Sequence, residues 1–228
     1  MDGAFAGFGP GVFAWFEGLE RDNSKAYFTA TRDVYEAEVR GGLIALLEEL
    51  AATLGGDVRV FRQQRDLRFS ADRTPYKTRT YGILQDPERA AGGLYAELSA
   101  RGLYAGAGFA RLARDQLARF RAAVDDARTG AALAEAAASA RAAGLDVAGG
   151  SLRTAPRGVP RDHPRIDLLR HTALFAGSRL AGAHGISRDA GLAHVAGTWR
   201  AAGPLVAWLE AHVGPSALAL GPRGPSSR

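Results

Sequence analysis

The stretch "GLYAELSARGLYAGAGF", residues 93–109, decides the fold class because its side chains alternate in character. Leu94, Ala96 and Leu98 fall on one face of an extended chain, and Tyr95, Glu97 and Ser99 fall on the other. The "ARG" in the middle suits a hairpin connection, and "TYGILQ" upstream has the same extended character. These patterns predict an antiparallel sheet of about three to five strands.

Helical patterns come before this extended region. The segment "PGVFAWFEGLERD" places apolar residues at helical spacing after a Pro-Gly start, which predicts a first helix near residues 10–21. From Ser24 an apolar stripe continues until Gly55–Gly56, which predicts a long second helix with an interruption at Gly41–Gly42.

Helical patterns also follow it. The Ala-rich segment 113–144 predicts two helices joined near Thr129–Gly130. "TALFAGSRL" predicts a further strand, and residues 193–213 predict a last helix that Pro204 either starts or kinks. The sequence therefore predicts an α+β fold, in which an antiparallel sheet is flanked by helices and the N-terminal helices are long.

The composition is that of a globular chain. Its 228 residues are 46% hydrophobic and 23% charged, which is enough for one sizeable core. We expect a single domain over residues 1–213 and a flexible tail over residues 214–228. No apolar run reaches 18 residues and the first residues lack a secretory pattern, so we expect a cytoplasmic location and no membrane partner.

The basic charge is concentrated in "VFRQQRDLRFSADRTPYKTRTYG", residues 60–82. From Arg59 to Arg79 there are seven basic and two acidic residues, a local net of +5, which equals the formal charge of the whole chain. The remaining residues carry 22 charges of each sign. One patch therefore accounts for the charge excess, which favours attraction of a local anion over wrapping of duplex DNA.

The backbone of this stretch is expected to change character along its length. Neither a helical nor an extended period gives it a clean apolar face, which favours a strand that runs into an irregular segment. Ser70 or Asp72 would cap a turn, and Thr74–Pro75 would force an extended conformation. Loops on a rigid scaffold often carry function.

Anion recognition is the chemistry that these residue types favour. Arginine forks hold phosphate or carboxylate bidentately, the Lys77 ammonium adds a point charge, and the Tyr76 hydroxyl completes the hydrogen bonding. Asp66 would orient an arginine, bind a cation or act as a base. Two alternatives stay open: an ion-pair network that holds the loop in place, and a protein interface.

The same stretch resembles the signature of a bacterial conserved-hypothetical family of about this length, R-x-x-R-D-x-R-F followed by [DN]-K-x-x-Y. Arg73 stands where that signature has lysine. "FEGLERDNSKAYF" and "LRTAPRGVPRDHP" resemble two further blocks of the family. The resemblance implies a shared architecture and a shared cluster, and it implies no reaction. The residues that match the signature are Arg62, Arg65, Asp66, Arg68, Phe69, Asp72 and Tyr76.

The resemblance suggests which segments converge. If Asn23, Lys25 and Arg157 meet the basic stretch at one end of the sheet, they form a polar pocket for which Tyr95 and Tyr104 supply an aromatic wall. A plain helix cap at Asn23 and a turn at Arg157 are the alternatives. The predicted ligand-binding residues are Arg62, Arg65, Arg68, Arg73, Tyr76, Asn23, Lys25 and Arg157, and the predicted catalytic residues are Asp66 and Lys77.

Other chemistries lack support in the sequence. The absence of cysteine excludes thiolate nucleophiles, and the five histidines form no metal-binding motif, so we predict no metal site and name no cofactor. The glycine-rich "GFGPG" and "GAGFA" lack phosphate-loop spacing and are interpreted as turns. The leading hypothesis is binding, with or without turnover, of a phosphorylated or otherwise anionic small molecule. The alternatives are a nucleic-acid-binding module, which the charge distribution favours less, and an interaction scaffold.

Overall fold

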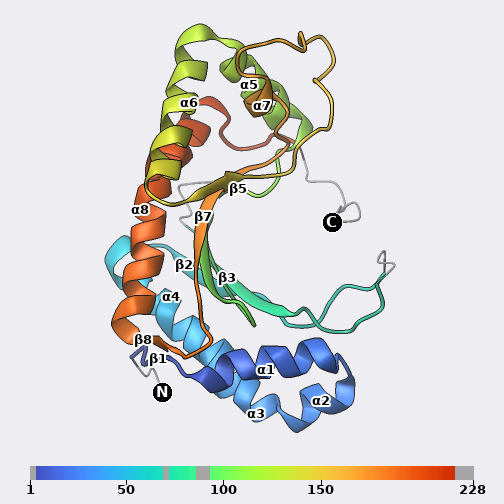
Figure 1. The fold of residues 1–228 in the computed structure, drawn as a ribbon, viewed down its shortest axis with the longest axis vertical. Coiled ribbons are helices and arrows are strands. Elements are labelled where there is room, and N and C mark those ends of the chain that lie inside the picture. The colour runs from blue at the N-terminus through green and yellow to red at the C-terminus, as the bar shows by residue number, and fades with distance from the viewer. Residues whose placement is uncertain (1–3, 69–71, 86–92, 219–228) are drawn as a thin grey trace.

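The computed structural model describes residues 4–68, 72–85 and 93–218 (Figure 1). Its main sheet has six strands, all paired antiparallel, in the order β2-β3-β4-β5-β7-β6. The predicted α+β fold with an antiparallel sheet flanked by helices is confirmed. The strands are β2 (Asp57–Val60), β3 (Arg79–Gln85), β4 (Gly93–Ser99), β5 (Gly102–Phe109), β6 (Asp146–Ala148) and β7 (Leu174–Leu180), and β1 (Gly7–Phe8) pairs separately with β8 (Ile186–Ser187).

The N-terminal helices lie where the sequence predicts them, but the second helix is interrupted at a different position. The expected break at Gly41–Gly42 is wrong, because the chain interrupts at Thr31 and then passes through a π-helical segment that ends at Arg40. Thr31 Oγ1 donates to the Tyr27 carbonyl at 2.9 Å and accepts from Trp15 Nε1 at 2.9 Å, which ties this break to the first helix. The elements are α1 (Pro10–Arg21), α2 (Lys25–Ala30), α3 (Arg32–Val34), η1 (Tyr35–Arg40) and α4 (Gly41–Leu54).

The helices that follow the sheet are also close to the expected positions. The junction of the Ala-rich pair lies at Asp126, earlier than expected, because the Asp126 carboxylate accepts from the backbone N–H groups of Arg128 and Thr129 and so caps the following helix. Pro204 lies inside the last helix. These helices are α5 (Arg114–Asp125), α6 (Ala127–Ala142), α7 (Ile166–Leu169) and α8 (Arg188–His212).

One face of the sheet forms the core. Ala96 and Leu98 of β4 are fully buried and face Ala105 and Leu103 of β5 across the ladder. Helices α4 and α8 lie along this side of the sheet (Figure 1). The alternation predicted for residues 93–99 is therefore present, with the apolar set turned toward the helices.

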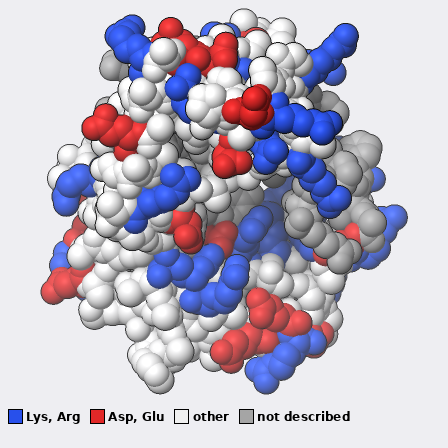
Figure 2. All heavy atoms as spheres, turned by 45° about the horizontal axis from the view of Figure 1, so that its top comes forward, with Lys and Arg blue, Asp and Glu red and all other residues white. Residues whose placement is uncertain are grey.

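The opposite face, which we call the open face, retains partial exposure in the middle of the sheet. Its rows follow from the register, which places Tyr81 opposite Glu97, Glu97 opposite Tyr104, and Tyr104 opposite Arg179. In a view of one side of the molecule, Lys and Arg side chains gather around a hollow (Figure 2). The open face consists of Arg79, Tyr81, Tyr95, Glu97, Ser99, Tyr104, Phe175 and Arg179.

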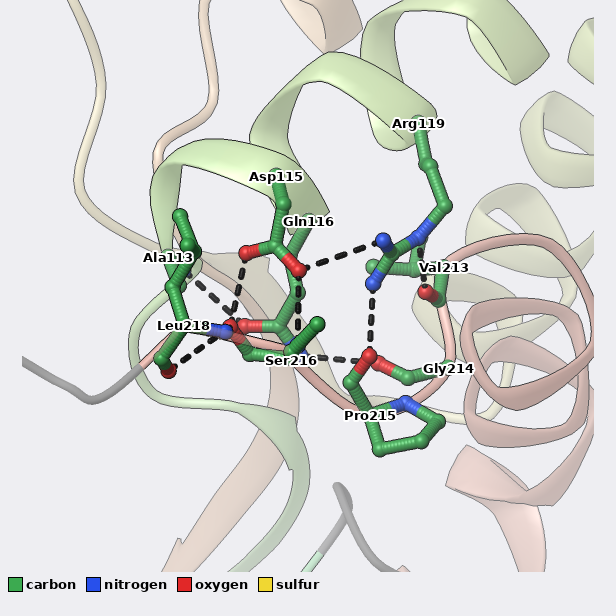
Figure 3. A network of polar contacts seen from close by, with 10 residues as sticks. Ala113, Asp115, Gln116, Arg119, Val213, Gly214, Pro215, Ser216 and Leu218 are labelled. Atoms are coloured by element: carbon green, nitrogen blue, oxygen red, sulfur yellow. Dashed lines mark hydrogen bonds and ion pairs between the residues drawn. The ribbon is translucent and has the colours of Figure 1, made fainter.

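The chain after α8 is held against α5 as far as residue 218 (Figure 3). Asp115 accepts from Ser216 Oγ at 2.7 Å and from the Ala217 N–H at 2.9 Å. Arg119 Nε donates to the Val213 carbonyl at 2.6 Å. Residues 214–218 belong to the segment expected to be a flexible tail, and residues 219–228 lie outside the described part of the chain. Among the described residues, none of the helices combines the length and the apolar character that crossing a membrane requires.

Candidate functional site

After β2 ends at Val60, the chain becomes irregular before β3, as the sequence predicts. Its two arms pair with each other as a hairpin, which the sequence did not predict. The Arg65 N–H donates to the Pro75 carbonyl at 2.9 Å, and the Lys77 N–H donates to the Gln63 carbonyl at 3.0 Å. These bonds bring the two arms of the segment side by side. Phe69 and Ser70, which the motif and the expected turn include, lie outside the described residues.

Asn23 and Tyr76 hold this hairpin to the N-terminal helices. The Asn23 side-chain amide donates to the Tyr76 carbonyl at 3.1 Å and accepts from the Tyr76 N–H at 3.0 Å, so it satisfies both backbone groups of one residue. The Tyr76 ring is buried and stacks on Phe28 with ring centroids 4.2 Å apart. Asn23 and Tyr76, both predicted as ligand-binding residues, therefore make structural contacts within the fold.

Two of the loop arginines, Arg65 and Arg68, are paired with acids of the loop itself. Arg65 bonds to Asp72 and, at 2.9 Å, to Thr74 Oγ1. Arg68 forms a bidentate pair with Asp66, with Nε to Oδ1 at 3.0 Å and Nη2 to Oδ2 at 2.7 Å. The hydrogen bonds from the Arg68 side chain and backbone lower the pKa of Asp66, which makes its carboxylate a weak proton acceptor. Asp66 therefore orients an arginine, one of the three roles considered for it.

Lys77 connects the hairpin with the open face. Its ammonium donates to the Arg62 carbonyl and lies 5.3 Å from the centre of the Tyr81 ring. Phe61 stacks on the same tyrosine with ring centroids 4.8 Å apart. Lys77, which directly follows the signature, thus contributes its charge at the border of the open face.

The other predicted cations do not meet in one pocket. The side chains of Lys25, Arg62, Arg73 and Arg157 are exposed. Arg157 lies in segment 149–165, near the top of the molecule in Figure 1. The hairpin that precedes β3 lies in the lower part of the same view. The structure therefore brings together Asn23, Tyr76 and Lys77 around the hairpin, and it does not bring Arg157 to them.

Glu97 is the centre of a polar cluster on the open face. Its side chain is 8% exposed, and its Oε1 accepts from Arg179 Nη2 at 3.2 Å. Its Oε2 accepts from the Tyr95 hydroxyl at 2.6 Å and lies 3.5 Å from Arg79 Nε. Arg179 also donates to Ser99 Oγ at 3.0 Å. A buried carboxylate thus orients two guanidinium groups.

Burial raises the pKa values of the two tyrosines beside this cluster. It raises the pKa of the Tyr95 hydroxyl well above its usual range, and the neighbouring Glu97 charge raises it further. Burial also raises the pKa of Tyr104. The Tyr95 hydroxyl keeps its proton, which it donates to Glu97 Oε2.

Two glycines allow the aromatic rings to lie across the sheet. A Cβ atom at Gly106 would meet Phe175 Cε1 at 2.3 Å, and a Cβ atom at Gly177 would meet the Tyr104 hydroxyl at 2.3 Å. Each ring therefore extends over the neighbouring strand. The interpretation of "GAGFA" as a turn is wrong, because residues 106–109 belong to β5 and Gly106 makes space for the Phe175 ring.

A second concavity is less suited to an anion. A groove of about 710 Å³ runs between α4 and α8, on the core side of β4. Its lining is mainly apolar, and its charged residues are Glu49, Glu210 and Arg200. Carboxylates outnumber the arginine there, whereas on the open face Arg79, Arg179 and the neighbouring Lys77 outnumber Glu97.

The sequence profile of the conserved hypothetical protein family DUF2461 matches residues 11–208. The chain belongs to this family. The family membership predicted from the signature is confirmed, and the DUF2461 region runs from the start of α1 to near the end of α8. No curated protein matches the chain.

In this DUF2461 chain, several residues that matter for the site were not predicted. Gln63 is 1% exposed; its amide donates to the Lys77 carbonyl, and its Oε1 accepts from Thr80 Oγ1 at 2.8 Å. Glu97 shares a strand face with Tyr95, which was predicted for the aromatic wall, and that shared face is the signal that points to it. Arg179 lies far away in the sequence, so only the pairing of β5 with β7 places it here.

Proposed function

We propose that the protein binds a small anionic molecule, phosphorylated or carboxylated, on the open face of its sheet. The observation that carries the proposal is the oriented arginine pair around the buried Glu97. The Arg79 side chain is 59% exposed while its Nε faces Glu97, so the rest of its guanidinium fork is available to a ligand. Arg79, Arg179 and Lys77 outnumber Glu97, which leaves the cluster positive.

The pairing inside the loop supports the open face over the loop as the binding surface. Arg65 and Arg68 each have an acidic partner within the hairpin. An anion that binds them competes with Asp72 and Asp66, whereas an anion at Arg79 adds to a cluster that already has excess positive charge. In this proposal the hairpin forms one border of the site and contributes Lys77 to it.

The test is calorimetric titration of the protein with pyrophosphate at low ionic strength. We expect saturable binding that weakens at least about tenfold in Arg79→Gln, since a hydrogen bond to a charged group contributes on the order of 1.5–3 kcal/mol. Arg62→Gln is the matched control, because that arginine is also exposed and lies outside the Glu97 cluster. Equal losses in both variants, or no binding to the parent protein, would contradict the proposal.

A further inference from the structure

The open face has an aromatic part beside its cationic part. Tyr95, Tyr104 and Phe175 lie with neighbouring ring centroids 6.0–6.4 Å apart. The Tyr104 and Phe175 rings are inclined by only 17° to each other. All three residues are partly exposed, so these rings form a surface in contact with solvent. We call them the aromatic platform.

The glycines opposite these rings determine the shape of the platform. Because Gly106 and Gly177 have no Cβ atom, the Phe175 and Tyr104 rings extend sideways over the adjacent strands. The Tyr104 and Phe175 rings are nearly parallel and Tyr95 meets both of them edge-on, so the Tyr104–Phe175 pair is the part of the platform suited to stacking on a planar group. Arg179 extends the platform, since its planar guanidinium lies 5.1 Å from the Tyr104 ring centre.

The cations and the platform are joined through shared contacts. Arg179 contacts both Glu97 and the Tyr104 ring, and Glu97 in turn contacts Arg79. Arg79 therefore lies within the reach of a single small molecule whose ring is placed on the platform. A simple inorganic anion would use the arginines and leave the rings without a role.

From this juxtaposition we infer that the ligand is a nucleoside phosphate, with its base on the aromatic platform and its phosphate at Arg79 and Lys77. The inference rests on the proposed function and specifies its ligand class. Aromatic rings next to arginines would also bind a nucleotide within a single-stranded nucleic acid, since the chemistry is shared. The inference is for the free nucleotide, and the experiment separates the two sources.

The experiment compares four probes by calorimetry on the full chain: AMP, UMP, ribose 5-phosphate and a ten-nucleotide single-stranded RNA. We expect both nucleotides to bind at least about tenfold more tightly than ribose 5-phosphate, because one stacked base contributes about that much. Phe175→Leu, which keeps an apolar side chain, is expected to remove this difference while leaving ribose 5-phosphate binding unchanged. Arg79→Gln should weaken all four probes.

The outcomes distinguish the inferred ligand class from the proposed anion binding on which it rests. If ribose 5-phosphate binds as tightly as AMP, the ligand class is wrong and the anion site stands. If none of the phosphates binds, both are wrong. If the RNA binds more tightly than AMP with a steep dependence on salt, the free nucleotide is the wrong source. The comparison of probes on the parent protein decides the question even if Phe175→Leu does not fold.

Discussion

At the scale of single residues, Glu97 is the most informative side chain. A carboxylate removed from water is tolerated only when it is paired and its oxygens are hydrogen-bonded. Arg179, Arg79 and the Tyr95 hydroxyl meet these requirements together. The same contacts hold the guanidinium groups in place, so one residue contributes to both the stability and the geometry of the open face.

We predict that Glu97→Gln lowers the free energy of unfolding by about 2 kcal/mol, because it leaves partly buried arginine charge without its counter-charge. The value is below that for a fully buried pair because the Arg179 and Arg79 side chains are 24% and 59% exposed. Urea denaturation monitored by circular dichroism measures the change. The exposed Glu48→Gln is the control and should differ little from the parent.

Asn23 also acts as a single residue, because its side-chain amide bonds to both backbone groups of Tyr76, as a neighbouring strand would. We predict that Asn23→Asp destabilises the protein by about 1–2 kcal/mol at neutral pH, because a carboxylate cannot donate to the Tyr76 carbonyl. Urea denaturation of the two proteins at pH 7 gives the difference. A stability equal to that of the parent would show that this donor bond is dispensable.

At the scale of elements, β5 and β7 build the platform from an alternation of aromatic residues with glycine. The glycines weaken the strands locally, since they bury no side chain and lose more backbone entropy than other residues. Their position opposite the Tyr104 and Phe175 rings supplies a physical reason for their presence.

Gly106→Ala is accordingly predicted to cost about 1–3 kcal/mol, because the added methyl group would overlap the Phe175 ring edge and displace it. Gly93→Ala is a matched control in the same sheet, since its nearest neighbour would be Ile83 at 3.7 Å, an ordinary contact. Thermal unfolding of the two variants measures the difference. Similar melting temperatures would show that the ring can move without cost.

At the scale of the whole molecule, the C-terminal segment closes the fold onto α5 (Figure 3). The hydrogen bond from Ser216 is the largest influence that lowers the pKa of Asp115 to about 2. Since the pKa in the folded state is lower than the ordinary value of about 3.9, the carboxylate stabilises this contact above about pH 4. That contribution is lost as the pH falls through the folded-state pKa.

We therefore predict that the backbone amide of Ala217, which donates to Asp115, reports a titration near pH 2 in an NMR pH series. Asp115→Asn should abolish this titration. Asp189→Asn removes an exposed acid far from the segment and should leave it unchanged. A midpoint near the ordinary aspartate value would contradict the proposed hydrogen-bonded state.

Local patterns were enough to predict much of the fold. The two-residue period of residues 93–99 and the apolar stripe of residues 10–21 with its Pro-Gly start depend on neighbours in the chain, so the strand, the helix and the α+β class could be predicted. The interruption at Thr31 could not, because Thr31 is hydrogen-bonded to Trp15 in another helix, a contact that no local pattern indicates.

The sequence by itself determined the family signature, the concentration of positive charge and the face on which Glu97 lies. Only the tertiary structure decided that the loop arginines pair with loop acids, and that Arg79 and Arg179 meet at a buried carboxylate. The physical reason is that charge and periodicity are properties of a local segment. Pairing and desolvation depend on which distant strands come together, and the register of β4, β5 and β7 sets that here.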